Sequence, residues 1–129
     1  MPHIDVFQYL MGRAKLESLP PDIQFNIISL LSKVNTLLER FGEFRKVTSG
    51  FRTQTDQMRI NPKVTKSNHL RGLCVDLEDK DGRLDAFCCE KDFAILKELD
   101  LYIESPTATI GWSHIQNIPP RSKKRSFIP

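Results

Sequence analysis

The clearest hydrophobic pattern in the chain lies between Pro20 and Gly42. Apolar residues recur there at spacings of three and four, which predicts an amphipathic helix with one apolar stripe. Pro20, Pro21 and Asp22 are typical of a helix start, and Gly42 is a natural end. The stripe consists of Ile23, Ile27, Leu30, Leu31, Val34, Leu38 and Phe41. We expect this helix to pack into the core, although a helix that binds a partner's groove has the same pattern.

Shorter segments downstream have the patterns of strands and of one more helix. We predict strands at 44–51, 73–78, 101–103 and 111–116, and a second helix over 88–100. Over 73–78 apolar and polar positions alternate, so Cys74, Asp76 and Glu78 share one face. Residues 53–68 are polar and indicate a loop, and residues 1–21 indicate a loosely structured lead-in. Helices segregated from short strands predict one α+β domain over residues 1–129.

Composition narrows the class of protein. Hydrophobic residues make up 40% and charged residues 27% of the 129 positions, which is typical of a soluble globular domain. No apolar run approaches the roughly 20 residues that span a bilayer, so we expect no transmembrane segment. The N-terminus lacks a basic start followed by an apolar stretch, which predicts no signal peptide and synthesis in the cytoplasm. A net charge of +3 is too small by itself to predict a nucleic-acid partner.

The three cysteines are Cys74, Cys88 and Cys89. An odd number, with two of them adjacent, does not fit the disulfide framework of a secreted protein. We therefore predict reduced thiols. The alternative is a structural zinc site built from cysteine and histidine, which no pair of cysteines at two-residue spacing supports.

Two histidines and one aspartate are candidate metal ligands. His69 and Asp76 are seven positions apart, and Gly72 between them permits the tight turn that would bring them together. His114 lies in a later strand, and pairing of the two strands would place Asp76 and His114 about 5 Å apart at the backbone. Two imidazoles and a carboxylate suit Zn²⁺ and leave a fourth position for water. Spacing alone leaves open an alternative in which the three residues make separate local hydrogen bonds.

A set of ordered motifs surrounds these residues. They are Ser49-Gly50-Phe51-Arg52, then Ser67, His69, Gly72 and Asp76, then Trp112 and His114. This order resembles the zinc D-alanyl-D-alanine carboxypeptidase family, which includes D-Ala-D-Ala dipeptidases, phage L-alanyl-D-glutamate endolysins and a related fold in hedgehog signalling domains. The resemblance covers residues 44–129 and looks closest to small phage-type members. It implies a small antiparallel sheet with helices packed on one face, and zinc bound by His69, Asp76 and His114.

The resemblance also implies roles for other residues. Arg52 would stabilise the oxyanion on the attacked carbonyl or bind a substrate carboxylate, because a guanidinium is planar and always charged. Ser67 would bind substrate or a metal ligand through a hydrogen bond, and its alternative is a loop serine with no special role. Trp112 would form a wall of the site or pack beneath it, and its alternative is a position in the core. Many members carry a glutamate just before the last histidine, but residues 109–113 contain no acid here. The nearest candidate for the general base is Glu104, whose alternative role is a solvated loop acid.

The implied activity is that of a zinc metallopeptidase that hydrolyses peptidoglycan stem peptides, at a D-Ala-D-Ala bond or between L-alanine and a D-amino acid. A phage-type enzyme would reach the cell wall after phage-assisted release or as part of the virion. The alternative is a catalytically weak binding or virion-structural module with the same fold. The basic tail, residues 119–129, is either solvated or attracted to an anionic cell-wall polymer. We expect a monomer with no nucleic-acid partner.

Overall fold

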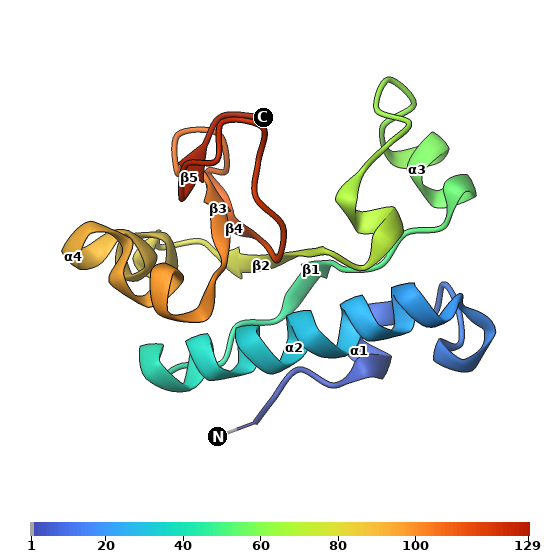
Figure 1. The fold of residues 1–129 in the computed structure, drawn as a ribbon, viewed down its shortest axis with the longest axis horizontal. Helices are drawn as coiled ribbons and strands as arrows, with labels where there is room; N and C mark the ends of the chain where they lie inside the picture. Colours follow the sequence, from blue (N-terminus) through green and yellow to red (C-terminus); the bar gives the residue numbers. More distant parts are fainter. Residues whose placement is uncertain (1) are drawn as a thin grey trace.

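In the computed structural model, which describes residues 2–129, helices cover one face of a small sheet (Figure 1). The described chain has four α-helices, α1 (Val6–Leu10), α2 (Pro21–Phe41), α3 (Gln54–Ile60) and α4 (Arg83–Leu99), and two 3₁₀-helices, η1 (Leu16–Ser18) and η2 (Asn68–Arg71). Its five strands are β1 (Val47–Ser49), β2 (Cys74–Asp79), β3 (Tyr102–Glu104), β4 (Gly111–Gln116) and β5 (Ser126–Phe127). The predicted α+β class is confirmed.

The strands form one sheet in the order β1-β2-β4-β3-β5. The first four are antiparallel to their neighbours, but β5 runs parallel to β3, so the prediction of a purely antiparallel sheet is wrong. The reason is that the chain after β4 turns back and lies along the outer edge of β3, where the amide of Ile103 donates to the carbonyl of Arg125 at 2.8 Å. The end of the basic tail is therefore part of the sheet.

The core lies between α2, α4 and the sheet. Helix α2 begins and ends as predicted, and Gly42 ends it in the left-handed conformation at φ 92°. Its buried residues are Ile27, Leu30, Leu31, Val34, Leu37 and Leu38. The sheet meets them with apolar side chains from one face only, including Val75, Leu77 and Ile115, each fully buried. No helix within residues 2–129 is both long enough and apolar enough to cross a membrane.

The N-terminal segment is more ordered than predicted. Helix α1 begins with a capping box in which Asp5 accepts from the amide of Gln8 and Gln8 accepts from the amide of Asp5. Tyr9 is fully buried, and its hydroxyl donates to the carbonyl of Cys74 at 2.8 Å. The expected loose lead-in is therefore wrong for residues 2–21, and Met1 lies outside the described residues. One turn of helix is too short to show a period, and the segment is anchored by contacts distant in sequence, including the hydrogen bonds between Ile4 and Asn35 and the burial of Tyr9 and Leu10.

Residues 53–68 also contain more structure than the predicted loop. Helix α3 starts with a capping box between Thr53 and Asp56, and it buries Gln57. Threonine followed three residues later by an acid was the signal for this helix start.

Helix α4 begins at Arg83 rather than at the predicted residue 88. Asp79 accepts hydrogen bonds from the amides of Leu84 and Asp85, which fixes the earlier start. Non-helical backbone interrupts α4 over residues 90–93.

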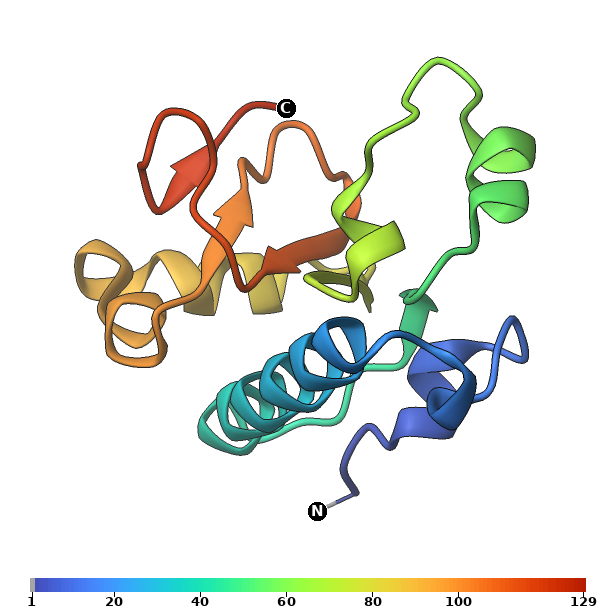
Figure 2. The ribbon, with the colours of Figure 1, turned by 45° about the vertical axis from the view of Figure 1, so that its right-hand side comes forward.

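Both ribbon views show α2 beneath the sheet and the C-terminal segment on the opposite side (Figures 1 and 2). Because side chains alternate along each strand, the face turned away from α2 carries the polar residues of β2 and β4. The candidate site lies on this face.

Candidate metal centre

The centre is built on a row of residues that crosses the sheet. Strands β2 and β4 place Asp76 directly opposite His114, as the sequence predicted. On the other side of Asp76, β1 contributes Ser49. Toward the other edge of the sheet, Glu104 of β3 pairs with Phe127 of β5. All five strands of the described sheet thus supply a residue to this row, and the loops add to it.

Glu104 enters this row through the pairing of β3 with β4. The last printed partners of that pairing are Ile103 and Ile115. One step further along the same antiparallel register, Glu104 lies beside His114. His114 therefore has Asp76 on one neighbouring strand and Glu104 on the other.

His69 reaches the row from η2. Ser67 caps this short helix by accepting from the amide of His69 at 3.2 Å, so it supports the backbone of the predicted ligand. The ring of His69 is held by the carbonyl of Gly50, which lies 2.8 Å from Nδ1. A carbonyl only accepts, so Nδ1 carries the proton and Nε2 keeps its lone pair. That Nε2 faces Asp76, 3.4 Å from Oδ2.

The ring of His114 is oriented in the same manner. The amide nitrogen of Gln116 donates to the carbonyl of Ile118 at 2.9 Å. The amide oxygen of Gln116 is thereby turned to accept from Nε2 of His114 at 3.0 Å. Nδ1 of His114 is then the free nitrogen, and it lies 2.8 Å from Oδ1 of Asp76. Both imidazole lone pairs converge on one carboxylate, an arrangement that needs a positive charge between them, either a proton or a metal ion.

The electrostatics of the site favour a cation. Burial alone would raise the pKa of Asp76, but its hydrogen bonds and charge interactions with His114 and His69 hold the pKa far below the usual value. Burial lowers the pKa of His114, but the hydrogen bond and charge of Asp76, together with the charge of Glu104, raise it above the usual value overall. The carboxylate therefore stays ionised in a site with little access to water.

A thiol joins these residues. The potential ligand atoms of His69, Cys74 and His114 all lie within 4.8 Å of one another, and all three residues are buried. This buried group could hold a metal ion. The sequence placed Cys74 on the same strand face as Asp76 but gave it no role at the metal. Cys74, Cys88 and Cys89 are all free thiols.

Glu104 lies within the electrostatic field of the centre. Its carboxylate is partly buried, and burial raises its pKa above the usual value. The negative charge of Asp76 acts in the same direction, while His114 and His69 oppose it. Extension of the β3–β4 register by one residue thus brings Glu104, the predicted general base, beside the centre.

Arg52 lies at the β1 end of the row. Its guanidinium donates to the hydroxyl of Ser49 at 3.0 and 3.2 Å and to the amide oxygen of Gln57 at 3.0 Å. Within residues 2–129 Arg52 forms no ion pair with a carboxylate. Burial and the charge of Asp76 raise the pKa of the Cys74 thiol, and the charge of Arg52 acts in the opposite direction. A cation held by neutral acceptors beside the site suits an anionic ligand. The sequence did not find Gln57, which positions this arginine.

Trp112 lies on the same strand face as His114, opposite Glu78. It is 37% exposed, which excludes the alternative that it packs in the core. Its role as a wall of the site stays a prediction.

Two glycines join the centre to the helices. A Cβ at Gly50 would lie 2.0 Å from the carbonyl oxygen of Tyr9, and a Cβ at Gly72 would lie 2.6 Å from the side chain of Ile27. Gly72 also has φ +69°, in the left-handed region. The turn between His69 and the strand is therefore pressed against α2, as the predicted tight turn requires.

A groove of about 570 Å³ runs beside His114. Its lining includes Asn68 from η2, Gln116 from β4, and Arg121 and Phe127 from the C-terminal segment. The ring of Phe127 lies edge-on to that of His114, with 6.3 Å between the centroids. The C-terminal segment thus lines a groove that adjoins His114 through Phe127 and Gln116.

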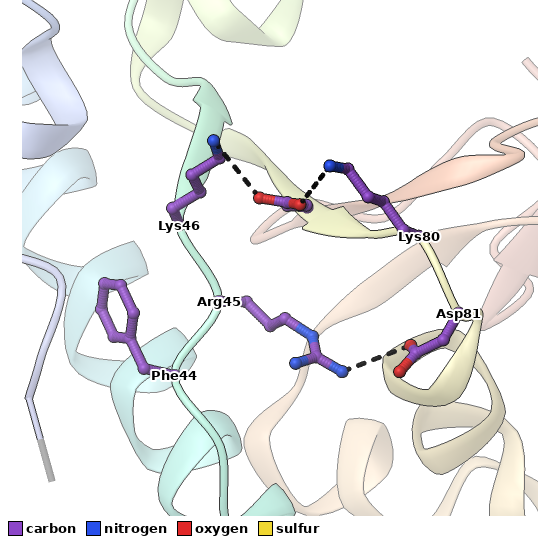
Figure 3. Close-up of a pocket in the computed structure, with 6 residues that line it drawn as sticks. Phe44, Arg45, Lys46, Lys80 and Asp81 are labelled. Carbon is purple, nitrogen blue, oxygen red and sulfur yellow. Dashed lines mark hydrogen bonds and ion pairs between the residues drawn. The ribbon is translucent and has the colours of Figure 1, made fainter.

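A second pocket, of about 390 Å³, lies over β1 and the end of β2 (Figure 3). Its cations are already paired: Lys46 and Lys80 both contact Glu78, at 3.4 and 3.3 Å, and Arg45 contacts Asp81 at 3.4 Å. It holds no imidazole or thiol, so we place the candidate chemistry at the groove beside His114.

On the helix-covered face, Asp85 forms a buried acid cluster with Asp79 and Ser113. Asp85 is 5% exposed and accepts from the hydroxyl of Ser113 at 2.6 Å. Burial, and then the charge of Asp79, raise the pKa of Asp85 from 3.8 to about 6.

The raised pKa of Asp85 predicts a pH-dependent stability. Because the folded pKa exceeds the unfolded one, the stabilisation is full below the unfolded pKa and is lost as pH rises through about 6. The free energy of unfolding should fall by about 1 kcal/mol between about pH 5 and about pH 7.5 from this group alone. Urea denaturation at both pH values should show a fall in Asp85→Asn that is about 1 kcal/mol smaller than in the wild type, because the raised pKa values of His114 and Glu104 still contribute in the variant. Asp92→Asn, at an exposed surface ion pair, should show the same fall as the wild type, and an equal fall in Asp85→Asn would contradict the assignment.

Comparisons with protein-family models, with curated proteins and with solved structures find no match to this chain. The resemblance to zinc D-alanyl-D-alanine carboxypeptidases therefore rests on the ordered motifs, and it stays a prediction.

Proposed function

We propose that the protein is a zinc metallopeptidase that hydrolyses the stem peptides of peptidoglycan. The observation that carries this proposal is the convergence of His69 and His114 on Asp76, with Glu104 on the next strand. The motif order of the sequence supplies the substrate class.

The donor set fits zinc. Imidazole nitrogens and a thiol suit Zn²⁺, whereas Mg²⁺ and Ca²⁺ prefer oxygen ligands. His69 would bind through Nε2 and His114 through Nδ1, because Gly50 and Gln116 hold the other nitrogens of the two rings. Asp76 would complete the set with a carboxylate oxygen. When bound, the ion acts as a Lewis acid for the scissile carbonyl and activates a water molecule.

Glu104 and Arg52 perform the remaining steps. Glu104 accepts the proton of the attacking water and delivers it to the amine that leaves, a transfer for which a carboxylate with a raised pKa is suited. Arg52 donates hydrogen bonds to the oxyanion or to a substrate carboxylate, since its charge is not neutralised by an acid in the described residues. The groove that adjoins His114 through Phe127 and Gln116 would hold part of the peptide.

The test is hydrolysis of purified peptidoglycan and of synthetic stem peptides by zinc-loaded protein. We expect new amino termini or free amino acids, identified by mass spectrometry, which also locate the cleaved bond. A chelator should stop the reaction, and added zinc should restore it. A protein that binds zinc stoichiometrically and releases nothing from either substrate would contradict the proposed activity.

A further inference from the structure

Cys74 occupies a position that the predicted ligand set does not explain. Cys74 is the first residue of β2 and is fully buried. It lies two residues before Asp76 and on the same strand face. Its strand partner is Gln116, the residue that orients the ring of His114. The backbone of Cys74 is fixed as well, because the buried hydroxyl of Tyr9 donates to its carbonyl.

We propose that the thiolate of Cys74 is a direct ligand of the bound metal, together with His69 and His114. The three potential ligand atoms lie within 4.8 Å of one another. Ligands that share a tetrahedral ion at about 2.0 to 2.3 Å each lie about 3.3 to 3.8 Å apart, so a small closure of the group around the ion is sufficient. No other cysteine takes part, because Cys88 packs in the core and Cys89 lies on α4, on the helix-covered face.

Binding is balanced by the release of two protons to solvent. One comes from the Cys74 thiol, whose sulfur forms the metal–sulfur bond, and the other is the proton that lies between the imidazoles and Asp76 in the metal-free protein, so the two imidazoles bind as neutral groups. A cation at this position also offsets the repulsion between the two imidazole lone pairs and the carboxylate of Asp76.

A fourth protein donor has a consequence for the proposed peptidase. The two histidines and Cys74 supply three ligands, and Asp76, which contacts both imidazoles, would supply a fourth. Four protein ligands are the coordination of a closed, structural centre. Water and the thiolate would then compete for one position on the ion, so hydrolysis would require that substrate binding displaces Cys74. This step rests on the proposed function, whereas ligation by Cys74 rests only on the metal centre.

The experiment uses the full chain loaded with cobalt(II) and, separately, with zinc. We expect a thiolate-to-cobalt charge-transfer band in the near ultraviolet, which is absent in Cys74→Ala and in Cys74→Ser and is retained in Cys89→Ala. X-ray absorption of the zinc protein should show one sulfur at about 2.3 Å beside nitrogen and oxygen ligands at about 2.0–2.2 Å.

The outcomes separate this inference from the proposed activity. A metal-loaded wild type with no sulfur in its coordination shell, or a charge-transfer band that survives in both Cys74 variants, would overturn it. Failure of the wild type to bind either ion would overturn it too. A protein that has the sulfur ligand but does not cut peptidoglycan would support the inference and contradict the peptidase.

Discussion

Replacing His69 with alanine is expected to remove stoichiometric zinc and to lower hydrolysis of stem peptides at least about a hundredfold. Loss of a residue that only orients a ligand already costs about 10- to 100-fold in metal affinity or activity, and loss of a ligand costs more. His69 is suited to be a ligand because its Nδ1 is committed to the carbonyl of Gly50 and its Nε2 faces Asp76. Elemental analysis after dialysis measures the metal, and the peptide assay measures turnover.

The chain offers a matched control for this substitution. His3 is the one remaining histidine besides the two in the centre, and it lies half-exposed beside Glu39, on the N-terminal segment. His3→Ala should therefore keep both zinc and turnover. Circular dichroism and a thermal melt would establish that His69→Ala is folded. A folded His69→Ala that retains one zinc ion per chain would contradict its role as a ligand.

The part of the centre built on strands could be predicted from the sequence for a simple physical reason. Side chains alternate along a strand, so the polar face of β2 follows directly from the pattern over 73–78. Antiparallel pairing then brings Asp76 opposite His114, because both stand on the polar faces of neighbouring strands. Gly72 indicated the turn that brings in His69, and the structure places that glycine against α2.

The supporting contacts could not be predicted in the same way. The carbonyl that fixes His69 comes from Gly50, and the approach of Gly50 to its neighbours depends on Tyr9 in α1. The amide that fixes Arg52 comes from Gln57, in a helix that the polar composition of residues 53–68 concealed. Each contact joins segments whose proximity is set by tertiary packing, and no period in the sequence encodes it.

The contacts of the C-terminal segment could not be predicted from its composition either. A run of basic residues predicts a solvated tail, yet Arg125 lies over the ring of Tyr102, with 4.4 Å from the guanidinium carbon to the centroid, and forms an ion pair with Asp100. These contacts hold Arg125 directly before Ser126 and Phe127, which pair with β3 at the sheet edge. Attraction of the remaining cations to an anionic polymer stays a prediction.

Replacing Glu104 with glutamine is expected to lower turnover by about 10²- to 10⁴-fold while zinc content is unchanged, the range typical for loss of a general acid–base group. Glutamine keeps the size of the side chain and cannot take up a proton from water. The expected separation of metal content from turnover distinguishes a base from a ligand, since His69→Ala should lose both.

Glu98→Gln is the control for this change, because Glu98 pairs with Arg40 on the exposed surface of α4 and should keep full turnover. The measurement is single-turnover hydrolysis of a stem peptide with zinc content determined on the same samples. Unchanged turnover in Glu104→Gln would remove Glu104 from the mechanism. The acid would then have to come from outside the row, because within residues 109–113 the chain offers none. Of the two carboxylates beside His114 in the sheet, Asp76 holds the imidazoles, so only Glu104 is placed to accept a proton.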